Sequence, residues 1–189
     1  QYSTKNQVTY PTFTFEYPAG WEITEEDISS SSENVVLTKN GTDVDIAFSQ
    51  IVEPSGSARA SIKSVTMVAD SKFWPTYVQA NNLAELGPFM VARLYLEPYN
   101  SASGEKYDEV EYYAVLPQTV LQPDHEGFSF FGGAPSFDYA GTLSFACAVP
   151  REGLDDSTRD EVISILSSFS NGETKADYEN ALSAAANAE

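Results

Sequence analysis

The tripeptide Asp124-His125-Glu126 brings together the side chains best suited to chemistry in this chain of 189 residues. It places the only histidine between two carboxylates. Carboxylate oxygens suit calcium, and an imidazole adds a nitrogen ligand for a transition metal. A structural zinc site needs about four ligands rich in His and Cys, and the chain has one residue of each type. We therefore predict Asp124, His125 and Glu126 as candidate metal ligands, with an exposed polar loop tip as the alternative.

Catalytic chemistry has weaker support in the sequence. A Ser-His-Asp arrangement would have to use His125, and the chain has neither a Gly-x-Ser-x-Gly elbow nor a phosphate-binding glycine loop. Cys147, the single cysteine, shares one side of a predicted strand with Leu143, Phe145 and Val149, because these residues are spaced two apart. That pattern is typical of a buried, unreactive thiol without a basic neighbour. We predict a protein that is not an enzyme and has no cofactor.

Aromatic side chains point to protein binding instead. The stretch from Pro117 to Gly141 has no strong hydrophobic period and contains Phe128, Phe130 and Phe131. Long irregular loops are often functional, and outward aromatic residues bury contact area at a low entropic cost. We predict partner contacts by Trp74, Phe128, Phe130 and Phe131. The alternative is that these rings cover the core.

The charge balance narrows the choice of partner. Asp and Glu number 28 against 10 Lys and Arg, which gives a net charge of −18. Such a surface repels phosphate backbones, so we predict no binding to nucleic acid. It suits cations, basic patches on proteins, or simple solubility. No apolar run approaches the roughly 20 residues of a membrane helix, and a single cysteine cannot form an internal disulfide.

Local signals predict mostly hairpins. Asn40-Gly41 lies between two alternating apolar runs, residues 35–38 and 44–48, which is a strong hairpin signal. Asp43 and Asp45 face away from the apolar side chains of the second run, either as solvated strand residues or as a ligand pair. Further strands are predicted near residues 13–15, 21–23, 87–97, 108–116 and 143–149.

Helices are predicted between and after these strands. Residues 58–71 are predicted as a helix because apolar residues recur there at helical spacing, namely Ile62, Val65 and Ala69. Asp155-Asp156-Ser157 caps a second helix that runs to about Phe169. The alanine-rich residues 171–189 form either a short helix or a frayed tail. Because hairpins predominate, we predict an α+β fold with an antiparallel β-sheet flanked by α-helices.

The segment Phe13-Thr14-Phe15-Glu16-Tyr17-Pro18-Ala19-Gly20-Trp21 resembles the opening of the PsbP-like (Mog-type) superfamily. In that family an aromatic strand runs into a Tyr-Pro-x-Gly-Trp turn. The resemblance continues as element order, through the Asn-Gly hairpin and a middle helix to a closing helix that ends in Ile165-Leu166-Ser167-Ser168-Phe169. It covers about residues 8–170 and is similar in character to the bacterial exported lipoprotein branch. It implies a PsbP-like α/β/α sandwich.

The resemblance also implies a non-catalytic adaptor that binds or stabilises other proteins. Residues 1–7 are then expected to form an N-terminal tether, and residues 8–170 one PsbP-like domain with 117–141 as a long loop insertion. Residues 171–189 follow as the C-terminal helix or tail. The expected function is an extracytoplasmic module that binds or assembles an envelope protein, with membrane contact only through a lipid anchor on a removed leader. The alternative is a calcium- or small-ligand-binding domain that uses the acidic loop around His125.

Overall fold

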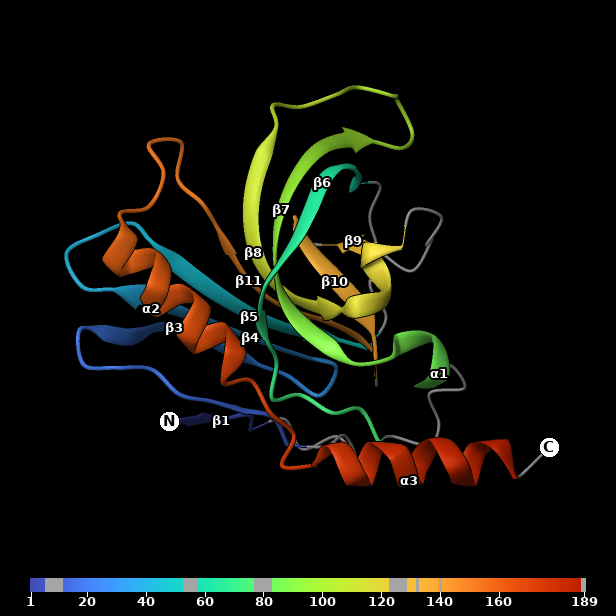
Figure 1. Cartoon of the computed structure of the whole chain (residues 1–189). Helices are drawn as coiled ribbons and strands as arrows, with labels where there is room; N and C mark the ends of the chain where they lie inside the picture. Colours follow the sequence, from blue (N-terminus) through green and yellow to red (C-terminus); the bar gives the residue numbers. More distant parts are fainter. Residues whose placement is uncertain are drawn as a thin grey trace.

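Antiparallel strand pairing organises the chain. The computed structural model describes residues 1–5, 12–52, 58–76, 83–122, 129–131, 133–139 and 141–187. Within them, nine strands form a large sheet in the order β3-β4-β5-β11-β8-β7-β6, with β10 paired to β11 and β9 paired to β10 (Figure 1). A separate two-stranded sheet joins β1 to β2. The predicted α+β class, with an antiparallel sheet and packed helices, is confirmed.

The described strands and helices have the following bounds. The strands are β1 (Tyr2–Ser3), β2 (Thr14–Phe15), β3 (Trp21–Ile28), β4 (Ser32–Lys39), β5 (Asp45–Ile51), β6 (Ala58–Asp70), β7 (Phe89–Asn100), β8 (Val110–Pro117), β9 (Ser129–Phe131), β10 (Ala134–Asp138) and β11 (Thr142–Ala148). The helices are α1 (Leu83–Leu86), the 3-10 turn η1 (Gln118–Leu121), α2 (Asp156–Ser167) and α3 (Lys175–Ala186).

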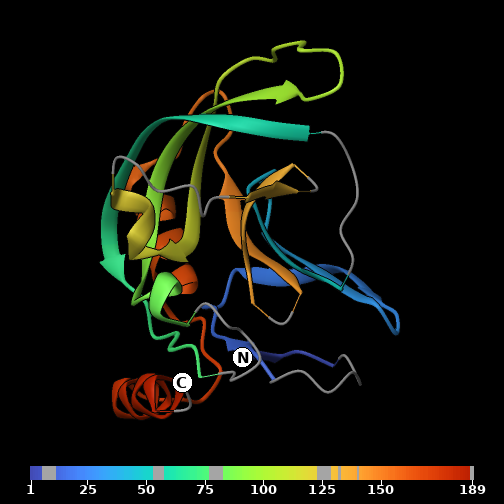
Figure 2. The same ribbon diagram turned by 90° about the vertical axis from the view of Figure 1, so that its right-hand side faces the viewer.

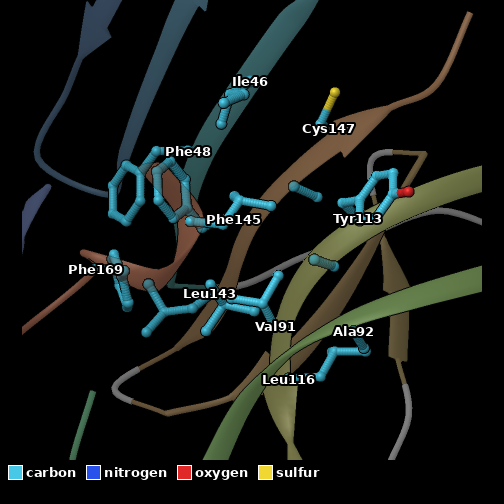
Figure 3. Close-up of a cluster of buried hydrophobic side chains, with 14 of the residues drawn as sticks. Ile46, Phe48, Val91, Ala92, Tyr113, Leu116, Leu143, Phe145, Cys147 and Phe169 are labelled. Atoms are coloured by element: carbon cyan, nitrogen blue, oxygen red, sulfur yellow. The ribbon is translucent and has the colours of Figure 1, made fainter. Parts of the chain in front are cut away.

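Helix α2 lies across one face of the sheet (Figure 1). Its buried residues include Val162 and Leu166, which recur at helical spacing and point into the core. The aromatic ring of Phe169, just after the helix, packs 5.2 Å from the Phe145 ring and 6.1 Å from the Phe48 ring. Phe48 and Phe145 alternate with outward residues along their strands, so one side of each strand faces the core, where both rings lie near Phe169 (Figure 3).

Two local predictions are confirmed. Asn40-Gly41 turns the chain between β4 and β5, and Gly41 has a φ of +74°, as the hairpin signal requires. Asp155 is the N-cap of α2, where its side chain accepts a hydrogen bond of 2.7 Å from the Thr158 backbone N–H. That bond holds the pKa of the Asp155 carboxyl below its usual value.

The predicted helix over residues 58–71 is wrong, because this stretch forms the edge strand β6. Its pairing with β7 shifts register between Ile62 and Ser64 and again between Met67 and Ala69. A bulge inserts one extra residue and changes which side later residues face. Ile62 and Val65 therefore share a face at a spacing of three, which imitates a helical repeat.

The prediction that residues 117–141 form an irregular loop is also wrong for their described part. That part contains η1 and the hairpin of β9 with β10, and β10 continues into β11. The Tyr112 hydroxyl donates to the Gly133 carbonyl at 2.5 Å, which fixes the hairpin to β8. Figure 2 shows β6, β7 and β8 curving together, with this hairpin between them and the β3–β5 half of the sheet.

The chain termini are better ordered than the sequence predicted. A tether over residues 1–7 is wrong for residues 1–5, because Tyr2 is buried and β1 pairs with β2. At the other end, α3 resolves the choice between helix and tail in favour of a helix. Thr174 begins it with a capping box to Asp177, and the ring of Tyr178 is buried.

The turn before β11 leaves no room for a side chain. Gly141 has a φ of +94°, and a Cβ there would lie 2.7 Å from the Ile51 carbonyl oxygen. Gly41 has a similar φ, but a Cβ there would meet nothing within 4 Å. We expect Gly41→Ala to lower the free energy of unfolding by about 1 kcal/mol, and Gly141→Ala by roughly 3 kcal/mol. Urea denaturation of both variants measures the difference, and equal losses would contradict a steric clash at Gly141.

Candidate functional site

The side of β3, β4 and β5 that faces away from α2 is exposed and carries only acidic charges among its described residues. Alternation places Val35, Leu37, Ile46 and Phe48 in the core and their neighbours outside. Strand register aligns the outward residues in rows, for example Glu22 with Thr38 and Asp45. We call this surface the acidic face, made up of Glu22, Thr24, Glu25, Asp27, Asn34, Val36, Thr38, Asp45, Ala47 and Ser49.

Hydrogen bonds across the strands hold the polar side chains of the acidic face. The hydroxyls of Thr24 and Thr38 lie 2.7 Å apart, and Thr38 donates to Asp45 Oδ1 at 2.6 Å. Four residues away along β4 and β5, Ser49 donates to Asn34 Oδ1 at 2.7 Å. Cross-strand pairs of this kind restrict rotamers and fix the surface before any partner arrives.

A basic residue that could neutralise this surface points the other way. Lys39 is the only Lys or Arg between residues 21 and 51. Its Nζ donates to Thr158 Oγ1 at 2.7 Å and lies 3.4 Å from Glu161 Oε2, both on α2. The Trp21 indole N–H donates to the same Glu161 oxygen at 2.6 Å. These contacts fix β3 and β4 to the helix and leave the carboxylates of the acidic face without a cation among the described residues.

A groove of about 780 Å³ runs beside α2, opposite the acidic face. Its lining combines the Tyr17-Pro18 turn with Lys72, Asp160 and Ser164. The Glu16 backbone N–H donates to Ser168 Oγ at 2.8 Å, which anchors the turn to the end of the helix. Hydroxyls, carboxylates and one ammonium suit a small polar ligand, and the volume lies in the range of ligand sites. No motif in the sequence pointed to this groove.

The predicted metal ligands Asp124, His125 and Glu126 lie outside the described residues and remain a prediction. Phe128 lies outside them as well. In the part of the chain that is described, no three His, Cys, Asp or Glu side chains gather as metal ligands would.

The other predicted contact residues have separate positions. Phe130 is only 4% exposed and packs edge-on against Tyr112, so it belongs to the core and not to an outward surface. Phe131 ends β9, and its side chain lies outside the described part. Trp74 is half-buried, with its ring 5.6 Å from that of Tyr178 on α3. Phe130 and Trp74, the two of these whose side chains are described, therefore lie in separate contacts and not in one aromatic patch.

Sequence reasoning noted the outward position of Asp43 and Asp45 but did not find the acidic face. The available signal was the run of acids after Trp21, on a strand whose apolar residues Trp21 and Ile23 face inward. A bulge between Ile23 and Glu25 breaks the alternation there, so the pattern could not assign those acids to one side.

Comparison with known proteins yields no relative. No family model, curated protein or solved structure matches the chain. The resemblance to the PsbP-like superfamily therefore remains a prediction. None of the described helices has the length and apolar character needed to cross a membrane.

The buried thiol gives a direct test of the core. Cys147 is fully buried, and burial raises its pKa to about 12, with the Asp45 and Glu111 carboxylates adding to the effect. At pH 8 the native thiol is therefore protonated and out of reach. We expect iodoacetamide to label the native chain roughly a thousandfold more slowly than the chain in guanidinium chloride. Equal labelling rates would show that the thiol is accessible.

Proposed function

We propose that this chain is a non-catalytic protein-binding module whose acidic face docks on a basic surface of a partner protein. The observation that carries the proposal is the one-sided charge of β3, β4 and β5. Glu22, Glu25, Asp27 and Asp45 share that face, and the neighbouring cation Lys39 is engaged on the opposite side. Such an array favours partners of opposite charge and speeds their encounter.

The spacing of the acids favours a protein over a single metal ion. Glu22, Glu25 and Asp27 lie along one strand, and successive same-side residues of a strand are about 7 Å apart. Carboxylates at that separation do not converge on one ion, but they match Lys and Arg side chains spread over a protein surface. Val36 and Ala47 lie among them and offer apolar contact area, as the core of a protein interface requires.

The state of the acids before binding also favours this arrangement. The acids are exposed, so pairing them with Lys or Arg at an interface does not first break an internal ion pair among the described residues. The ladder of Thr24, Thr38 and Asp45 is already ordered by its own hydrogen bonds, which lowers the entropy lost on binding. Binding of this type weakens steeply with salt, because exposed charges are screened within about 8 Å at physiological ionic strength.

Site-specific crosslinking tests the proposal. A photo-crosslinking amino acid at the exposed Ala47, at the centre of the acidic face, is introduced into the full chain in its native cells. We expect one dominant adduct with a protein that has a basic surface. The triple variant Glu22→Gln, Glu25→Gln, Asp27→Asn should reduce the adduct more than about tenfold, because it removes the charges that attract the partner.

A matched variant distinguishes an effect of the acidic face from an effect of the overall charge of the chain. Glu105→Gln, Glu109→Gln and Glu152→Gln remove the same number of exposed acids away from β3–β5 and should leave the adduct intact. A crosslinker at the exposed Tyr107 should give no such adduct. Equal losses in both triple variants, or the same adduct from Tyr107, would mean that bulk charge and not the acidic face holds the partner.

A further inference from the structure

Glu33 is a carboxylate that the sheet buries completely. It lies on β4, on the side that faces α2, and its exposure is 0%. Its neighbours on this side of β4 are the core residues Val35 and Leu37. A buried carboxylate must exchange its water for hydrogen-bond donors, because a carboxylate left without donors strongly destabilises the fold. The source of those donors shows what this position is built to hold.

The N-terminal segment supplies donors to Glu33. The Tyr2 hydroxyl donates to Oε1 at 3.0 Å, and the Lys5 backbone N–H donates to Oε1 and Oε2 at 2.9 and 3.1 Å. Burial and the Glu33 carboxylate raise the pKa of Tyr2 far above its usual value, so the phenol stays a proton donor. Lys5 Nζ also pairs with Glu26 at 2.5 Å. These contacts recognise the tyrosine hydroxyl, a backbone N–H and the lysine ammonium of one short, extended peptide.

The ring of Tyr2 completes this recognition. It stacks on Phe15 with ring centroids 5.2 Å apart and is 5% exposed. The backbone of the segment pairs with β2 over a short stretch. Among the described residues, the pairing of β1 with β2 consists of two residue pairs, Tyr2 with Phe15 and Ser3 with Thr14. One further backbone hydrogen bond joins Thr4 N–H to the Phe13 carbonyl at 2.9 Å. The described contacts of the segment therefore centre on the side chains of Glu33, Glu26 and Phe15, with the Lys5 backbone N–H among the donors.

Hydration of Glu33 offsets part of the free energy lost when the segment is released. When Tyr2 and Lys5 leave, water regains access to the Glu33 carboxylate, and solvation of that charge offsets part of the lost hydrogen bonding. An all-apolar contact would have no such term. A segment held by an aromatic anchor over a carboxylate is thus suited to reversible docking.

We infer that the surface formed by Glu33, Glu26 and Phe15 is a binding site for an extended peptide segment with a tyrosine and, three residues later, a lysine. In this structure the chain's own residues 1–5 occupy it as a removable strap. The site lies on the opposite side of β4 from the acidic face, so this inference is independent of the proposed function and can fail separately.

A peptide added in trans tests the site in the full-length chain. The variant Tyr2→Ala removes the anchor and should lower the midpoint of thermal unfolding. The synthetic peptide Gln-Tyr-Ser-Thr-Lys, at millimolar concentration, should then raise the midpoint of this variant by about 3 °C or more, with saturation. The peptide should leave the wild-type chain unchanged, because its own strap is present at a higher effective concentration.

Three controls identify the contacts. The peptide with alanine in place of tyrosine should have no effect on the Tyr2→Ala variant. The matched variant Tyr107→Ala, at a tyrosine that is 49% exposed, should not respond to the peptide. In Tyr2→Phe, which keeps the ring but loses the hydroxyl, the loss of midpoint and the peptide response should both be smaller.

Three outcomes would overturn the inference. One is a Tyr2→Ala midpoint that the tyrosine peptide does not raise, and another is an equal rise with the alanine peptide. The third is a Tyr2→Ala chain that does not fold, because residues 1–5 would then be an inseparable part of the core.

Discussion

Aromatic packing around Phe169 is the contact on which the rest of this structure depends. The centroid of its ring lies between 5.2 and 6.1 Å from those of Phe13, Phe48, Phe73 and Phe145. The five rings come from segments far apart in the chain, so the cluster joins the N-terminal region, two central strands and the end of α2. Pairs of this kind contribute about 0.5–1.5 kcal/mol each beyond their buried area. Because none of these contacts is local, the sheet and the helix stabilise each other.

This cluster also decides which side of the sheet is free. Once Phe48 and Phe145 face α2, the pleat sends Ala47 and Ala146 to the other side. There the β9–β10 hairpin, fixed through Tyr112, covers the centre of the sheet, and the residues of β3–β5 remain exposed. The acidic face is thus a geometric consequence of where the core lies. Its acidic composition does not follow from the position of the core, because an exposed strand face can carry charges of either sign.

Local signals in the sequence predicted the elements that depend on few residues. Asn40-Gly41 and Asp155 specify a turn and a cap through their own backbone preferences and hydrogen bonds, so both predictions hold. Residues 58–71 were predicted incorrectly because two bulges gave a strand the apolar spacing of a helix. Tyr2 was assigned to a tether because its partner Glu33 is 31 residues away in sequence. No pattern within a window of roughly 10 to 20 residues contains that contact. The groove beside α2 could not be predicted for the same reason, because its lining residues come from distant parts of the sequence.

The basic side chains are distributed unevenly over the structure, and this distribution bears on the charge of the acidic face. At least eight of the ten Lys and Arg side chains form ion pairs with carboxylates in the described part of the chain. Several of these pairs join distant segments, such as Lys5 with Glu26 and Lys39 with Glu161. Exposed pairs of this kind add little stability, typically about 0–1 kcal/mol. What they do is relieve repulsion where segments of a chain with a charge of −18 must meet. None of the ion pairs found among the described residues includes a carboxylate of the acidic face, and this unrelieved repulsion is the basis for proposing a basic partner.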